Sequence, residues 1–126
     1  MGIESTKFLV VDDFSTMRRI VRNLLKELGF ADVQEAEDGV DALAKLRAGD
    51  FEFVVSDWNM PNMTGIELLK TVRGNPSTAK LRFILLTGHS EKDQVLEAAK
   101  SGVTAYVTKP LSETILIQKV LEVLSA

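Results

Sequence analysis

The chain has 126 residues, of which 45% are hydrophobic and 26% are charged, and its formal net charge is −3. These proportions are those of an ordinary soluble domain, and a chain of this length can bury a sizeable core. The absence of cysteine excludes disulfides, thiolate catalysis and zinc sites built on cysteine. Acidic and basic residues are interspersed, so no basic surface for nucleic acid or anionic membrane is expected. Because no signal peptide or membrane-spanning run is visible, we expect a cytoplasmic protein.

The first predicted strand leads into a pair of acidic residues. A nearly continuous apolar run at 7–11 predicts a strand buried on both faces, and Asp12 and Asp13 follow it directly. Either Ser15 or Thr16 is then expected to cap a helix. The inward positions of this helix follow i, i+3, i+4 spacing and are Met17, Ile20, Val21, Leu24, Leu25 and Leu28.

The third predicted strand ends in a single carboxylate. A weaker strand at 32–36 comes before it, with a helix between them that Asp38 is expected to cap and that Gly49 ends. The apolar run at 53–57 is typical of a buried strand, and its last residue is Asp57. A carboxylate at the end of a buried strand is unfavourable for stability, so Asp57 is a candidate functional residue.

A further helix and strand lead to a hydroxyl group. Thr64 and Glu67 have the capping-box spacing that opens a helix. A fourth apolar strand, at 83–86, finishes at Thr87, and Ser90 is expected to cap the helix that follows it.

The last predicted strand ends in a lysine, and the last helix is unusually apolar. The strand spans 105–108 with Lys109 directly after it, and Ser112 is expected to cap a helix that runs through Leu124. The inward residues of this helix are Leu116, Val120, Val123 and Leu124, and a second apolar stripe contains Ile117 and Leu121. We expect the second stripe to be buried under a loop, with a self-association surface as the alternative.

Strand and helix alternate five times with short connections. This pattern predicts one α/β domain over residues 1–126, with a doubly wound parallel sheet of five strands and helices on both faces. In such sheets, ligands bind at the carboxyl ends of the strands. The polar residues at the predicted strand ends are Asp12, Asp13, Asp57, Thr87 and Lys109, and we expect them to converge at one edge.

The expected cluster suits the binding of a cation and a phosphoryl group. Two unit charges ~4 Å apart repel by roughly 4 kcal/mol at an effective dielectric near 20, and Mg²⁺ bound by carboxylates and water relieves that repulsion. Asp57 can act as a nucleophile that forms an acyl phosphate. Lys109 can neutralise charge on the phosphoryl group, and the Thr87 hydroxyl can donate a hydrogen bond to it.

Two other assignments conflict with particular residues. A flavin-binding domain of the same architecture needs a hydroxyl- and glycine-rich phosphate loop, but here that loop begins with Asp12 and Asp13. A phosphatase of the haloacid dehalogenase type uses Asp-x-Asp with the second aspartate as general acid, and Asn59 occupies that position. We also considered solvated strand ends as an ordinary explanation for the acidic pair.

Two segments carry the pattern of a known family. They read Val-Asp-Asp-Phe-Ser-Thr-Met-Arg-Arg at 11–19 and Ser-Asp-Trp-Asn-Met-Pro-Asn-Met at 56–63. With them the chain resembles the receiver domains of response regulators, most closely chemotaxis regulators of the CheY type. The resemblance implies a flavodoxin-like (βα)5 fold with strand order 2-1-3-4-5. Because the resemblance covers the whole chain, it also implies a stand-alone receiver domain without an output domain.

The resemblance also implies roles for individual residues. Asp57 would accept a phosphoryl group from a histidine kinase, with Lys109 and Thr87 in contact with that group. The Mg²⁺ ligands implied by the family are Asp12, Asp13, Asp57 and the backbone carbonyl of Asn59. Thr87 and Tyr106 would form the conformational switch. Such a protein is a signalling protein rather than an enzyme, although it catalyses its own phosphotransfer and dephosphorylation.

The C-terminal half departs from the CheY pattern, in the loop after Thr87, at Leu111 and in the less basic last helix. The partners implied are the histidine kinase and, for output, a flagellar motor switch protein or a phosphatase, with the protein itself monomeric. The alternatives are a phosphate sink, or a chimeric or engineered receiver scaffold without motor-switch output. His89 is expected to be a solvated loop residue that can influence water access to the acyl phosphate.

Overall fold

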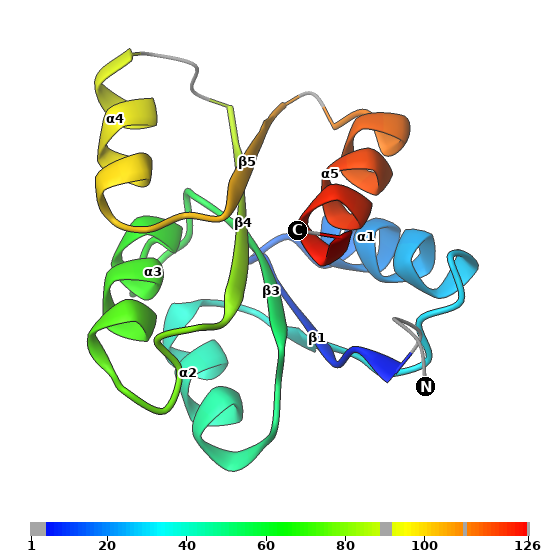
Figure 1. Ribbon diagram of the computed structural model, residues 1–126, viewed down its shortest axis with the longest axis horizontal. Coiled ribbons are helices and arrows are strands. Elements are labelled where there is room, and N and C mark those ends of the chain that lie inside the picture. The colour runs from blue at the N-terminus through cyan, green and yellow to red at the C-terminus, as the bar shows by residue number, and fades with distance from the viewer. Residues whose placement is uncertain (1–4, 89–91, 110, 126) are drawn as a thin grey trace.

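The fold is an alternation of strands and helices around one parallel sheet (Figure 1). The computed structural model describes residues 5–88, 92–109 and 111–125. In chain order the elements are β1 (Phe8–Val11), α1 (Ser15–Glu27), β2 (Val33–Ala36), α2 (Gly39–Ala48), β3 (Phe53–Asp57), α3 (Gly65–Gly74), β4 (Arg82–Thr87), α4 (Lys92–Lys100), β5 (Ala105–Thr108) and α5 (Glu113–Ser125). All paired strands are parallel and their order is β2-β1-β3-β4-β5. The predicted doubly wound α/β fold is therefore confirmed.

The sheet separates two layers of helices. α1 and α5 cover one face, and α2, α3 and α4 cover the other (Figure 1). Successive residues of a strand point to opposite faces, so Phe8 and Val10 pack toward α1 and α5, whereas Leu9 and Val11 pack toward α2 and α3. Burial on both faces explains why β1 and β3 read as continuous apolar runs.

Aromatic packing stabilises the amino-terminal edge of the sheet. The ring of Phe8 lies 4.7 Å from those of both Phe30 and Phe53, measured between centroids. Phe8 and Phe53 are the first residues of β1 and β3, whereas the acidic residues follow or end these strands. Large apolar side chains therefore fill one edge of the sheet and leave the other edge to polar groups.

Three of the predicted helix caps are confirmed. The Asp38 carboxylate accepts a hydrogen bond from the backbone N–H of Asp41 at the start of α2. Thr64 and Glu67 form a complete capping box at the start of α3. The Ser112 hydroxyl accepts from the backbone N–H of Ile115 at 3.3 Å, at the start of α5. The predicted cap at Ser90 lies outside the described residues.

The predicted cap of α1 is wrong. Phe14 is the N-cap residue, with no side-chain hydrogen bond, and Ser15 already lies inside the helix. The helix begins earlier than predicted because the carboxylate of Asp12 accepts the backbone N–H of Phe14 at 2.9 Å and sets the turn. Ile20 was also expected to face inward, but its side chain is 39% exposed.

The apolar helix α5 contributes one buried stripe and a partly covered second one. Leu116, Val120 and Val123 are buried, and Ile117 packs against the same core while staying partly exposed. Leu121 is exposed, so ordinary burial accounts for only part of the second stripe. Self-association through the remainder stays a prediction. Among the described residues, no helix has the length and apolar character needed to span a membrane.

Candidate functional site

Three carboxylates converge at the carboxyl edge of the sheet, as predicted. Asp12 follows β1, Asp57 is the last residue of β3, and β1 is paired directly with β3. Oxygen atoms of Asp12, Asp13 and Asp57 all lie within 4.8 Å of one another. Asp12 and Asp57 are buried, whereas Asp13 is exposed. The cluster is therefore open to solvent on the side of Asp13.

One carboxylate oxygen of Asp12 has no hydrogen-bond partner among the described residues. Its backbone N–H donates to the carbonyl of Ala36 at 3.1 Å, and its Oδ1 accepts the N–H of Phe14. Its Oδ2 is buried and has no hydrogen-bond partner among the described residues, although the whole side chain is only 3% exposed. Burial, reinforced by the charges of Asp57 and Asp13, raises the pKa of Asp12 to about 6. An orphaned, acceptor-only oxygen of this kind calls for a ligand.

Lys109 forms an ion pair with Asp57. Lys109 Nζ lies 2.6 Å from Asp57 Oδ1, and the Asp57 side chain is 7% exposed against 31% for the lysine. Lys109 pairs with Oδ1, so the other carboxylate oxygen of Asp57, Oδ2, is not held by the lysine. The pair therefore orients the carboxylate while keeping an oxygen for chemistry.

Thr87 lies next to this ion pair in the sheet. It ends β4 and is buried, and the preceding residue, Leu86, is the register partner of Asp57. The backbone N–H of Lys109 donates to the carbonyl of Thr87 at 2.7 Å. The end of β4 thus connects the strand that carries Asp57 with the segment that carries Lys109.

The other two predicted residues, Asn59 and Tyr106, are more exposed than Asp12 and Asp57. Asn59 lies two residues beyond the end of β3 and is exposed. Tyr106, on β5, is 37% exposed and lines a groove with Val95 of α4 and Ile115 of α5. The tyrosine therefore belongs to the outer face of the molecule in this conformation. His89 lies outside the described residues.

Gly65 is a site residue that the sequence analysis missed. Its backbone N–H donates to the carbonyl of Trp58 at 2.8 Å. A Cβ added to Gly65 would lie 2.2 Å from the carbonyl oxygen of Asp57 and 2.9 Å from Leu85 Cδ2. Only glycine permits α3 to begin so close to the backbone of Asp57. The available sequence signal was a glycine directly after the capping residue.

An apolar rim borders the acidic cluster. A pocket of about 430 Å³ is lined by Asp12, Asp13, Phe14, Thr16, Met17, Ile20, Asp57 and Lys109. Phe14 and Ile20 are exposed there. This position explains why Ile20 departs from the inward stripe predicted for α1.

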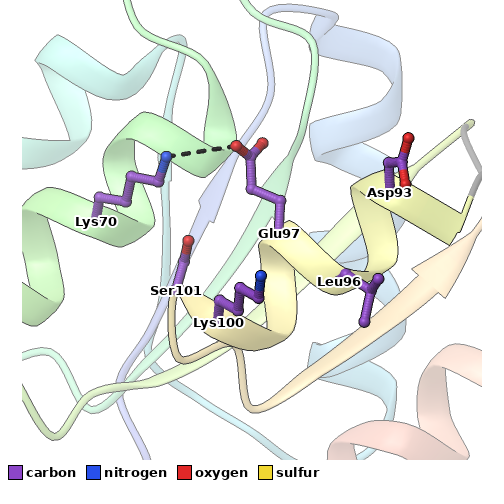
Figure 2. A pocket seen from close by; sticks show the side chains of 6 residues that line it. All are labelled: Lys70, Asp93, Leu96, Glu97, Lys100 and Ser101. Atoms are coloured by element: carbon purple, nitrogen blue, oxygen red, sulfur yellow. Dashed lines mark ion pairs between the residues drawn. The ribbon is translucent and has the colours of Figure 1, made fainter.

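A second pocket lies between α3 and α4, far from the carboxylates in sequence. Figure 2 shows Lys70 reaching from α3 toward Glu97 of α4, with Asp93, Leu96, Lys100 and Ser101 around them. The Lys70 and Glu97 charges are 3.6 Å apart and both side chains are about half exposed. A solvated ion pair of this kind contributes little energy. The acidic cluster therefore remains the stronger candidate site.

The acidic cluster fits a hard divalent cation. Its three carboxylates supply oxygen ligands that lie within 4.8 Å of one another, and the buried Asp12 Oδ2 has no hydrogen-bond partner among the described residues. Mg²⁺ is bound in proteins by one or two carboxylates together with water and phosphate oxygens. The residues present therefore match what this ion requires.

Comparisons of the sequence with known proteins point to one family. Residues 8–121 match the response regulator receiver domain family. The chain is 50% identical to chemotaxis protein CheY-3 of Vibrio cholerae over 116 residues, which are 92% of this chain and 89% of that protein. It is also 50% identical to chemotaxis protein CheY of Pseudomonas aeruginosa over 114 residues, which are 90% of this chain and 92% of that protein.

Solved structures show the same arrangement. The structure of chemotaxis response regulator CheY4 of Vibrio cholerae superimposes with a TM-score of 0.89 at 33% identity, covering 95% of this chain and 99% of that one. The receiver domain of a signal transduction histidine kinase from Syntrophus aciditrophicus gives a TM-score of 0.88 at 27% identity, covering 96% of this chain and 91% of that one.

Proposed function

This chain belongs to the response regulator receiver family, and we propose that it accepts a phosphoryl group on Asp57 to relay a chemotaxis-type signal. Proteins of this kind transmit signals and do not turn over an external substrate. One observation supports the proposal most strongly. The buried Asp57 carboxylate is paired with Lys109 at 2.6 Å beside two further carboxylates that suit a cation.

The reaction is a transfer from a phosphohistidine of a histidine kinase. A carboxylate oxygen of Asp57 attacks phosphorus, an O–P bond forms, and the P–N bond breaks. The electron pair of that bond stays on the imidazole nitrogen, which takes up a proton. Lys109 neutralises part of the charge on the phosphoryl oxygens, and the Thr87 hydroxyl donates a hydrogen bond to one of them.

We assign the cation site to Asp12, Asp13, Asp57 and the backbone carbonyl of Asn59. When bound there, Mg²⁺ supplies positive charge that offsets the carboxylates and the incoming phosphoryl oxygens. The carboxylates themselves hold the site in place, since Asp12 is fixed through its backbone and Oδ1. Self-dephosphorylation by water at the same site would reverse the signal.

The signal would leave through a conformational change. Movement of Thr87 toward the phosphoryl group would let Tyr106 turn inward, which would remodel the groove between α4, β5 and α5. The named relatives are chemotaxis proteins, so a flagellar motor switch protein or a phosphatase in the cytoplasm is the partner that we favour. The chain spans about nine-tenths of the length of those relatives, and we also propose that this receiver domain works as a monomer.

Trp58 gives a direct test, because it is buried next to Asp57. We would titrate its fluorescence with Mg²⁺ and then with beryllofluoride, in the wild type and in Asp57→Asn. A saturable response to each, with the beryllofluoride response lost in the variant, is the expected result. An undiminished beryllofluoride response in the variant would contradict Asp57 as acceptor. A motor-switch peptide that binds equally with and without beryllofluoride would instead favour a phosphate sink.

A further inference from the structure

Arg18 connects the acidic cluster to the edge of the sheet. Its Nη1 donates to the backbone carbonyl of Asp12 at 2.6 Å, and its Nε donates to Glu35 Oε1 at 3.2 Å. Glu35 lies on the edge strand β2, and its other oxygen accepts from Arg22 Nη1 at 2.8 Å. The Arg18 side chain is 18% exposed. A planar guanidinium held by two partners in this way has little freedom to move.

The Arg18 contact completes the anchoring of Asp12. The N–H of Asp12 is bonded to Ala36, its carbonyl accepts Arg18, and its Oδ1 accepts Phe14 N–H. Oδ2 is the one polar atom of Asp12 left without a partner among the described residues, and the Asp12 carboxylate belongs to the acidic cluster. Because α1 has no side-chain N-cap, the turn between β1 and α1 depends on these bonds.

We propose that Arg18 is a positioning residue for the cation site: by fixing the backbone of Asp12, it sets where Oδ2 lies. The inference rests on the proposed Mg²⁺ site. Groups that hold a metal ligand in place typically change metal affinity by about 10- to 100-fold when they are removed. Arg18 reaches the ligand through the ligand's own backbone, so it acts on the geometry of the site without touching the cation.

Electrostatics and positioning predict opposite signs for the loss of Arg18. Arg18 carries a positive charge close to a cation site, so a role through charge alone would make its removal strengthen Mg²⁺ binding. Loss of positioning would weaken Mg²⁺ binding, because the Asp12 carboxylate would no longer be held where the other carboxylates converge. The direction of the change therefore separates the two explanations.

The variants to compare are Arg18→Gln, Arg18→Lys and Arg19→Gln. Arg19 is the neighbouring residue on α1, and its exposed side chain makes no ion pair or hydrogen bond to any described residue. Arg19→Gln thus removes the same charge from the same helix without removing an anchor. Urea unfolding of each variant would establish that all three remain folded at the temperature of the assay.

The first readout is the Mg²⁺ dissociation constant from Trp58 fluorescence. We expect Arg18→Gln to weaken binding about tenfold. Arg18→Lys should lie between Arg18→Gln and the wild type, because one ammonium keeps the charge but cannot reproduce both contacts. Arg19→Gln should bind as tightly as the wild type or slightly more tightly. Equal affinities for Arg18→Gln and Arg19→Gln would overturn the inference.

The second readout is amide hydrogen exchange without Mg²⁺. The Phe14 N–H, which is bonded to Asp12 Oδ1, should exchange faster in Arg18→Gln and at the wild-type rate in Arg19→Gln. Weaker Mg²⁺ binding with unchanged Phe14 exchange would also overturn the positioning role. A wild type that shows no Mg²⁺ response would contradict the proposed function itself. If the wild type binds Mg²⁺ and Arg18→Gln has the same dissociation constant, only this inference is contradicted.

Discussion

Asn62 Nδ2 donates a hydrogen bond to Asp38 Oδ2 at 2.8 Å and joins the two loops that precede α2 and α3. Among the described residues other than glycine, Asn62 alone has a positive φ, 69°. Asparagine tolerates this left-handed conformation better than most residues. The loop that carries Asn59 is thereby tied to the cap of α2, so the two loops form one support beside the acidic cluster.

This tie predicts a pH dependence of stability. The backbone N–H of Asp41, and then the Asn62 amide, hold the pKa of Asp38 below its usual range. A lowered carboxyl pKa adds stability that is present above the unfolded pKa near ~4 and is lost as the pH falls through the folded pKa. We expect Asp38→Asn to be less stable than the wild type at pH 7, with the difference shrinking as the pH falls below the unfolded pKa. Urea unfolding across this range measures it, and a constant difference would contradict the prediction.

The contact between Gly65 and Asp57 predicts a steric effect. Gly65→Ala would force a Cβ against the Asp57 carbonyl, and overpacking of this kind typically costs about 1–3 kcal/mol. Gly74→Ala is the matched control, because nothing lies within 4 Å of its added Cβ. Ala favours a helix over Gly, so the control should unfold at the same or a higher urea concentration. Equal losses in both variants would refute the close approach at Gly65.

The helix caps predict a contrast between two hydroxyl residues. Thr64→Ala removes the cap of α3, and such a loss costs about 1 kcal/mol. Ser15→Ala should change the free energy of unfolding by no more than about 0.5 kcal/mol, because Ser15 does not cap α1. Urea unfolding of the two variants provides the comparison. A loss at Ser15 as large as that at Thr64 would mean that α1 is capped in solution by this hydroxyl.

Removing one carboxylate should abolish most of the stabilisation by Mg²⁺. In EDTA we expect Asp12→Asn to melt at or above the wild-type temperature, since one of three converging charges is gone. In Mg²⁺ the wild type should gain stability by ligand binding, about 2.7 kcal/mol at a hundredfold excess over the dissociation constant. Asp12→Asn should gain little.

The control for this thermal experiment is Asp50→Asn. Asp50 is exposed and precedes β3, at the opposite edge of the sheet from the cluster. This variant makes the same charge change and should keep the full stabilisation by Mg²⁺. Loss of stabilisation in both variants would show that net charge, and not the cluster, governs the response.

The sequence predicted those features that depend on the chain's own periodicity. Alternating strands and helices imply a parallel sheet, and a parallel sheet brings Asp12 and Asp57 to the same edge. The cap of α1 was misplaced because Ser15 is a good capping residue by type, whereas the Asp12 carboxylate set the turn first. No local pattern marks Arg18, because one of its partners is a backbone carbonyl and the other, Glu35, comes close only when α1 lies against β2.

The ion pair between Asp57 and Lys109 joins positions 52 residues apart, with consequences for the order in which the molecule is assembled. During synthesis, the three carboxylates leave the ribosome well before the lysine does. A nascent chain that has reached the end of β4 holds the acidic residues without their ammonium partner, so their mutual repulsion opposes early closure of the central strands. The compensating ammonium group arrives with Lys109, which directly follows β5. We therefore expect a chain truncated before Lys109 to form only a loosely packed sheet, and the acidic edge to close as the final event of folding.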